Sequence, residues 1–256
     1  MKILFIGDIF GQPGRNVVSQ MLPQLRDELK IDLIIANGEN AAGGMGITQE
    51  IAQELFLSGI HVITSGNHVW KEKKIVDFLK IEPRLLRPLN YPPDVPGNGS
   101  IIIESNKIKA GIVNLMGRTF LSEIDCPFRT GMKEIERIRE ETSVIIVDMH
   151  GEATSEKSAM GWLLDGTVSA VVGTHTHVQT ADERILPCGT AFITDVGMTG
   201  PRDSVIGIKR DIAIRRFLTQ IPIRFEVAKG EAQFNAVLIE VDSISGKAVS
   251  IKRIQR

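Results

Sequence analysis

The chain has 256 residues, a formal net charge of −1 at neutral pH and 43% hydrophobic residues. This length suits one large domain or two small ones, and the near-zero charge gives no electrostatic reason to expect a long nucleic acid or a membrane surface as partner. No apolar run approaches the roughly 20 residues of a membrane-spanning helix, and the two cysteines form neither a metal-binding pattern nor a disulfide framework. We therefore expect a cytoplasmic protein.

The N-terminal third of the sequence predicts three successive strand–loop–helix units. Short apolar runs typical of buried strands alternate with segments whose apolar residues recur at helical spacing. This alternation favours parallel strands joined by helical crossovers. Pro23 is expected to kink the first helix or move its boundary. The predicted strands are residues 2–7, 31–36 and 61–64, and the predicted helices are residues 15–29, 49–57 (capped by Thr48) and 71–79.

The remainder of the chain combines long loops with further strands. Residues 87–99 and 117–129 are predicted as surface loops, and loops of this length are often functional. No repeat, low-complexity segment or linker is present, so we expect a single domain over residues 1–256. The other predicted elements are a hairpin of 101–103 and 108–115, helix 132–141, strand 144–147, helix 152–164 (capped by Thr154 or Ser155), strands 170–172 and 190–194, a glycine-rich turn at 197–200, and a closing hairpin of 236–241 and 248–251.

Polar side chains follow several of these predicted strands at the point where each strand ends. After the apolar run 170–172, His175 and His177 stand two residues apart, and in an extended segment this spacing places both imidazoles on the same side. In parallel sheets, ligands sit beyond the carboxyl ends of the strands, so we expect these residues to lie at such a site. They are Asp8, Glu39, Asn40, Asn67, His68, His150, His175 and His177.

The chemistry of this set predicts a metal site. It combines carboxylates, amides and imidazoles without a thiolate, which suits Mn, Fe, Zn or Ni and argues against a cysteine-based structural zinc site. The ligands are too many for one ion and suit two ions about 3.5–4 Å apart, bridged by a carboxylate. For such an oxygen-rich site we favour iron or manganese over zinc.

Five of these polar blocks, in their order along the chain, resemble the motifs of the calcineurin-like binuclear metallophosphoesterases. The similarity is closest to the YmdB-type subfamily, whose second block has Glu in place of the usual Asp, followed by Asn, as Glu39 and Asn40 do here. The blocks are Gly7-Asp8, Asn37-Gly38-Glu39-Asn40, Gly66-Asn67-His68, His150 and Gly173-Thr174-His175-Thr176-His177, and the stretches 7–15, 126–129 and 153–157 extend the similarity over nearly the whole chain.

The resemblance implies an α/β protein with the four-layer metallophosphoesterase fold, in which a central β-sandwich is flanked by α-helices. It also implies a hydrolase, a metal-dependent phosphodiesterase that converts 2',3'-cyclic nucleotides (2',3'-cAMP and 2',3'-cGMP) to nucleoside monophosphates through a metal-bridging hydroxide. A regulatory role in the cell is a further expectation.

The resemblance further implies a role for each site residue. The general superfamily motif expects a histidine two residues after Asp8, but this sequence has Phe10, which cannot bind a metal, and Asn40 is the nearest candidate to replace it. His68, next to Asn67, is implied to be the proton donor to the leaving oxygen. The implied ligands are Asp8, Glu39, Asn40 and His177 for metal 1, and Glu39, Asn67, His150 and His175 for metal 2.

Two alternative functions remain open at this point. The same pair of metals would serve a phosphomonoesterase or a nuclease, because the metals perform the chemistry while the loops select the substrate. A protein of another class, a regulatory binding module that senses a nucleotide, would also fit the motifs. We expect a small-molecule cyclic nucleotide as substrate and neither a membrane nor a long nucleic acid as partner, and a homo-oligomer is left open.

Overall fold

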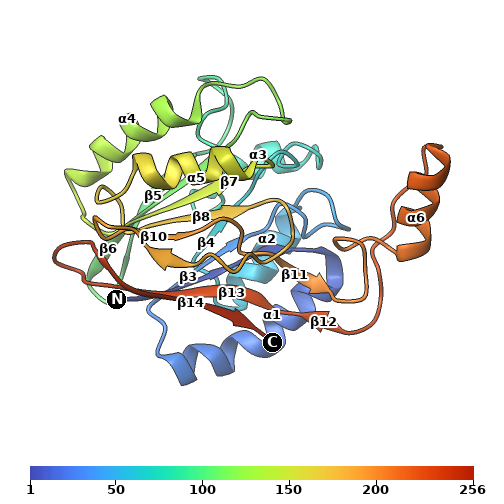
Figure 1. Cartoon of the computed structure of the whole chain (residues 1–256), viewed down its shortest axis with the longest axis horizontal. Helices are drawn as coiled ribbons and strands as arrows, with labels where there is room; N and C mark the ends of the chain where they lie inside the picture. The colour runs from blue at the N-terminus through green and yellow to red at the C-terminus, as the bar shows by residue number, and fades with distance from the viewer.

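The computed structural model describes residues 1–256 and has four layers, in which two β-sheets pack face to face between two layers of helices (Figure 1). A cluster of 19 buried apolar residues, among them Phe5 and Ile112, fills the space between the sheets. A further apolar cluster packs one sheet against its helices, and another packs the second sheet against its own. The predicted four-layer fold is thus confirmed. Helices α1 (Gly11–Leu29), α2 (Gln49–Leu57) and α3 (Ile75–Leu79) cover one sheet, and α4 (Pro127–Arg139) and α5 (Thr154–Leu163) cover the other.

The first sheet contains the three N-terminal strands, which are parallel as the sequence predicts. Along its central strand the side chains alternate, so that Ile3 and Phe5 face the other sheet while Leu4 and Ile6 face the helices. A strand buried on both faces needs such a continuous apolar run. The strand order is β14 (Ala248–Gln255), β13 (Asn235–Val241), β1 (Lys2–Ile6), β3 (Leu33–Asn37) and β4 (Val62–Thr64).

The second sheet has a parallel core of four strands with an antiparallel strand at each edge. The predicted hairpin is confirmed, because β5 and β6 pair in antiparallel register from Ser100 opposite Val113 to Ser105 opposite Ile108. The strand order is β5 (Ser100–Ser105), β6 (Ile108–Met116), β7 (Ile145–His150), β8 (Ala170–Thr174), β10 (Ala191–Ile193) and β9 (Arg184–Ile185).

A small third sheet holds the segment that contains Asp8. It consists of β2 (Asp8–Ile9), β11 (Met198–Pro201) and β12 (Ala232–Gln233). Residues 197–200 were predicted as a turn, and this prediction is wrong, because Met198 pairs in parallel register with Asp8. The four residues of β11 and the two of β2 show too little sequence pattern to be recognised as strands.

The helix boundaries differ from the sequence prediction in instructive ways. Helix α1 begins at Gly11 rather than at residue 15 and continues through Pro23. The hydroxyl of Thr48 accepts the amide hydrogen of Ile51, which confirms the predicted cap of α2. The predicted caps of α5 are wrong, because Ala153 occupies that position and offers no side-chain acceptor.

Helix α6 (Arg210–Thr219) was not predicted, and it projects away from the layered body (Figure 1). Ala213 is its only buried residue. Its apolar residues Ile214, Phe217 and Leu218 recur at helical spacing but are exposed, so the pattern was present in the sequence without a core for it to cover. None of the helices in the structure combines the length and hydrophobicity that crossing a membrane requires.

Replacing Phe5 by alanine tests the packing between the sheets. Phe5 is fully buried, so we expect the substitution to lower the free energy of unfolding by about 3–5 kcal/mol. The control is Leu57→Ala at a side chain that is 89% exposed, for which a change within about 0.5 kcal/mol is expected. Urea denaturation measures both, and equal effects of the two substitutions would contradict the assigned core.

Candidate metal centre

The predicted site residues lie beyond the carboxyl ends of strands from both large sheets. Asp8 is in β2, just after β1, and Glu39 and Asn67 follow β3 and β4 of the first sheet. His150 ends β7 and His175 directly follows β8 in the second sheet. Because β1, β3 and β4 are parallel, as are β7 and β8, the strand ends within each sheet come together at one edge.

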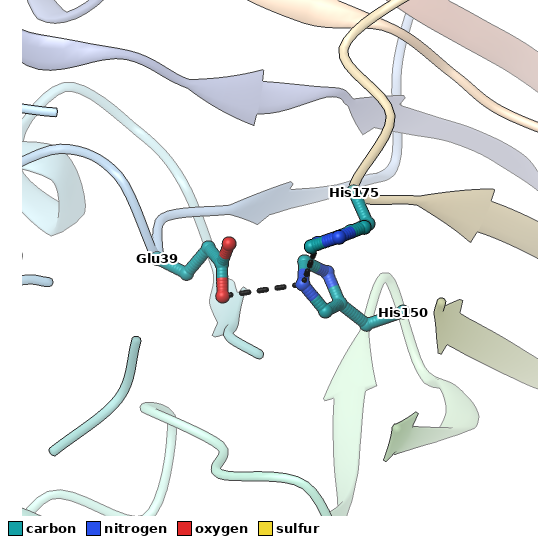
Figure 2. A group of neighbouring side chains, drawn as sticks. All are labelled: Glu39, His150 and His175. Atoms are coloured by element: carbon teal, nitrogen blue, oxygen red, sulfur yellow. Dashed lines mark hydrogen bonds and ion pairs between the residues drawn. The ribbon is translucent and has the colours of Figure 1, made fainter. Parts of the chain in front are cut away.

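One group of donor atoms surrounds Nε2 of His150. This nitrogen lies 3.2 Å from Oε2 of Glu39, 3.1 Å from Oδ1 of Asn67 and 3.0 Å from Nδ1 of His175. Figure 2 shows Glu39, His150 and His175 pointing toward one another, and their ligand atoms all lie within 4.8 Å of each other. The structure thus brings together one carboxylate, one amide and two imidazoles, a donor set typical of a transition-metal site.

A second group of donor atoms adjoins the other oxygen of the same carboxylate. Oε1 of Glu39 accepts from Nδ2 of Asn40 at 3.1 Å, and that amide also lies 3.1 Å from Nε2 of His177. His177 Nε2 in turn lies 3.8 Å from Oδ1 of Asp8. His68 borders this group, with Nδ1 2.8 Å from Oδ1 of Asn40. All eight predicted site residues therefore belong to one continuous cluster.

The donor set fits two cations. Oδ1 of Asp8 is buried and has no hydrogen-bond partner, although a buried polar atom normally has one. The two groups of ligand atoms meet at Glu39, which offers one oxygen to each. A buried acceptor without a partner and a carboxylate shared between two groups are what two metals with one bridging ligand require.

His150 is oriented by a buried polar group behind it. Its Nδ1 lies 2.9 Å from the hydroxyl of Thr174, and that hydroxyl donates its hydrogen to Asp148 at 2.7 Å. Because the hydroxyl has a single hydrogen, it accepts from Nδ1 of His150, so that Nε2 of the neutral ring has a free lone pair. Asp148 also accepts from the hydroxyl of Thr64 at 2.5 Å and from Nδ2 of Asn37 at 3.1 Å.

The other two histidines are oriented in the same manner. Nε2 of His175 lies 3.1 Å from Oε2 of Glu152, and Nδ1 of His177 lies 2.9 Å from the carbonyl oxygen of Ile206. Metal-binding histidines commonly donate their second ring hydrogen to such partners. Sequence analysis missed Asp148, Thr174 and Glu152 as parts of the site, and the only signal was their position within two residues of a histidine.

Phe10 occupies the position where the general superfamily motif has a histidine. It is buried, and its ring lies edge-on to that of His177, with the centroids 5.4 Å apart. A Cβ atom on Gly44 or Gly207 would come within 2.7 or 2.5 Å of the Phe10 ring. The aromatic ring therefore fills a close-packed slot beside the second group of donor atoms and holds His177 from one side.

Burial and neighbouring charges shift the pKa values of the centre in opposite directions. Burial raises the pKa of Asp8 to about 7, against the lowering effects of His177 and His150. Burial also raises the pKa of Glu39, but the charge and hydrogen bond of His150 outweigh it, and this pKa lies well below its usual range. For His150, burial lowers the pKa, and Glu39 overcomes this to raise it to about 9. In the metal-free protein Glu39 and His150 thus stabilise each other's charged forms, and a cation bound at Nε2 would replace the proton of His150.

The layered fold and this mixed nitrogen and oxygen centre at the edge of both sheets define the chain as a metallophosphoesterase. Residues 4–254 match the family model described as YmdB-like protein, and the chain belongs to this family. The resemblance inferred from the sequence motifs is therefore confirmed.

Individual relatives match over the full length of the chain. A Bacillus subtilis protein, the 2',3'-cyclic-nucleotide 2'-phosphodiesterase, is 50% identical over 99% of this chain and 96% of its own. A hypothetical protein from Thermus thermophilus is 42% identical, with a TM-score of 0.94 over 100% of this chain and 99% of its own. A novel phosphatase from Mycoplasma pneumoniae is 38% identical, with a TM-score of 0.94 over 100% and 93%.

The substitution Glu152→Ala tests whether this residue orients His175. Loss of the partner frees the imidazole to rotate, so we expect the affinity of the metal-free protein for Mn²⁺ to fall about tenfold. Isothermal titration calorimetry measures this affinity, and Glu140→Ala on the exposed face near the end of α4 is the control. An unchanged affinity in Glu152→Ala would show that the contact does not support the ligand.

Proposed function

We propose that this protein is a two-metal phosphodiesterase that opens the cyclic phosphate of 2',3'-cyclic nucleotides to give nucleoside monophosphates. The observation that supports it most directly is the pair of donor groups that share Glu39, one oxygen on each side. The substrate class follows from the Bacillus subtilis relative, which is half identical over nearly the whole of both chains.

The two donor groups provide four proposed ligands for each metal. Coordination by Asn40 requires its oxygen, whereas its Nδ2 faces His177 and Glu39 in the structure. The oxygen and nitrogen of an amide exchange places when the group turns over, and they are assigned from the surrounding hydrogen bonds. The proposed ligands are Asp8, Glu39, Asn40 and His177 for metal 1, and Glu39, Asn67, His150 and His175 for metal 2.

When bound, two divalent metals lower the pKa of a coordinated water and neutralise charge that develops on the phosphoryl oxygens. Asp8 and Glu39 contribute the only negative charges among the proposed ligands. Two divalent cations therefore leave the centre at about +2, which favours a phosphate ester as its guest. On the chemistry of these nitrogen and oxygen donors, we propose iron or manganese in preference to zinc.

His68 is proposed as the proton donor to the leaving oxygen. Its amide hydrogen is donated to Oε2 of Glu39 at 3.2 Å, and its Nδ1 faces Asn40, whereas Nε2 has no protein partner. When the oxygen of Asn40 turns to the metal, its NH₂ group turns to Nδ1 of His68, which must then accept. The proton of the neutral ring then resides on Nε2, the nitrogen that is free to face the substrate.

His68→Ala is expected to keep both metals and to lose about 10²–10⁴ in turnover, the usual contribution of general acid–base catalysis. Metal content measured by mass spectrometry of the dialysed protein separates loss of the proton donor from loss of the metals. Wild-type turnover in this variant would remove His68 from the mechanism.

Asn40→Ala is expected to lose metal 1 and to retain metal 2, because it removes one ligand of metal 1, and metal 1 has a single imidazole where metal 2 has two, so that it is the more labile ion. Asn67→Ala is the matched variant on the other side and should affect metal 2. Two full equivalents of metal in Asn40→Ala after dialysis would contradict the ligand assignment.

The substrate assignment is tested with protein reconstituted with Mn²⁺ or Fe²⁺ and a panel of esters. Hydrolysis of 2',3'-cAMP is compared with that of 3',5'-cAMP, bis-p-nitrophenyl phosphate and p-nitrophenyl phosphate. Selective opening of the 2',3'-cyclic ester is expected. Activity confined to the generic diester would leave the metal chemistry intact and refute the proposed substrate class.

Phosphomonoesterase activity is the second candidate, favoured by the match to the novel phosphatase from Mycoplasma pneumoniae over the full chain. Preference for p-nitrophenyl phosphate in the same panel would establish it.

A nucleotide-sensing role is separated from both enzymatic functions by the substitution Glu39→Gln, which removes the shared carboxylate. If the folded but inactive Glu39→Gln protein restores the wild-type phenotype of a strain that lacks the protein, binding rather than turnover is the cellular function.

A further inference from the structure

The turn between the two histidines of the centre has an unfavourable backbone conformation. His175 has a φ of 105° and His177 a φ of 67°, a region that residues other than glycine rarely adopt. Such conformations are strained and persist only where the surroundings impose them. Contacts outside the ligand set must therefore hold this turn.

Thr176, the residue between the two histidines, makes two such contacts. Its amide hydrogen is donated to Oδ2 of Asp195 at 3.0 Å, and its hydroxyl is donated to the same oxygen at 2.7 Å. Hydrogen bonds to a carboxylate are stronger than those between neutral groups. One carboxylate oxygen thus binds the turn at its midpoint.

Asp195 is itself held on both of its oxygens. Its Oδ1 accepts the amide hydrogen of Gly197 at 2.8 Å, and its Oδ2 accepts from Nζ of Lys157, in α5, also at 2.8 Å. Nζ of Lys157 donates further to the carbonyl oxygen of Thr174, at the end of β8. Lysine and aspartate are rarely buried completely, yet both side chains of this pair have no exposed surface.

We propose that Lys157 and Asp195 are positioning residues that, through Thr176, hold His175 and His177 ready to bind both metals. Neither side chain belongs to the proposed ligand set, and a buried ion pair contributes little net stability on average. The inference rests on the proposed ligand assignment, in which His175 binds metal 2 and His177 binds metal 1. Loss of the contacts of Thr176 is therefore expected to lower the affinity for both metals, whereas loss of Asn40 or Asn67 lowers the affinity for one.

The substitution Thr176→Val tests this proposal, because it removes one hydrogen bond to Asp195 and leaves the ion pair in place. Metal-free protein is titrated with Mn²⁺ by calorimetry, which measures both binding steps without substrate. We expect both affinities to fall by about 10- to 100-fold. Thr176→Ser keeps the hydroxyl and is expected to restore wild-type affinities.

Thr180→Val is the matched control. Thr180 hydrogen-bonds the backbone of Asp195 and not its carboxylate, donating to the carbonyl oxygen and accepting the amide hydrogen. Asp195→Asn, which removes the charge, is expected to lower both affinities at least as much as Thr176→Val. Thermal unfolding of each metal-free variant shows whether it folds, and turnover of Thr176→Val is expected to return in excess Mn²⁺.

Unchanged affinities in folded Thr176→Val and Asp195→Asn, loss of a single metal in both, or an equal loss in Thr180→Val would overturn the proposal. Failure of the proposed function has a different signature. Two metals bound by the wild-type protein without hydrolysis of 2',3'-cAMP would refute the substrate class and leave this inference intact. Failure of the wild-type protein to bind two metals would refute the ligand assignment and the inference with it.

Discussion

The centre depends on a carboxylate that joins the two sheets directly behind the ligands. Asp148 belongs to β7 of the second sheet, and it accepts hydrogen bonds from Thr64 in β4 and Asn37 in β3 of the first. Asn114 of β6 adds a second polar link through two hydrogen bonds with the backbone of Ser65, next to β4. The rest of the space between the sheets is filled by apolar side chains, whose attraction is not directional. The carbonyl oxygen of the Asn37 side chain also accepts the amide hydrogen of Glu39. The shared carboxylate of Glu39 is therefore placed by the same polar contact that fixes one sheet on the other.

This arrangement explains why the proposed ligands could be picked out from the sequence as one cluster. Each follows a short apolar run, and a buried strand that ends at a sheet edge must place its next polar residue at that edge. Parallel pairing within each sheet placed Glu39 and His150 at strand ends, and the family motifs indicated that the two belong to one site. Their actual contact at 3.2 Å needs the two sheets to face one another, which no local pattern predicts.

The residues that contact the proposed ligands from behind were not recognisable, for a physical reason. Asp148 is part of a strand, and its carboxylate is satisfied by side chains from three other strands, so its role exists only in the folded chain. Glu152 lies just before α5 and Lys157 lies near its beginning, where charged residues are common in any helix and do not indicate a functional role. Strand β11 was missed because it is too short to show alternation, whereas the apolar residues of α6 do recur at helical spacing and were overlooked.

The order of strands in the first sheet has a consequence for the protein during its synthesis. Strand β1, which leads into Asp8, lies between β3 and β13, and the amino group of Met1 bonds the carbonyl oxygen of Val241, 240 residues away in sequence. Translation at about 5–20 residues per second separates these partners by tens of seconds. During that interval the nascent chain exposes an unpaired edge of β1, and Asp8 lacks the neighbouring strand β11 that orders it. A chain that stops before β11 therefore leaves Asp8 without the strand that orders it.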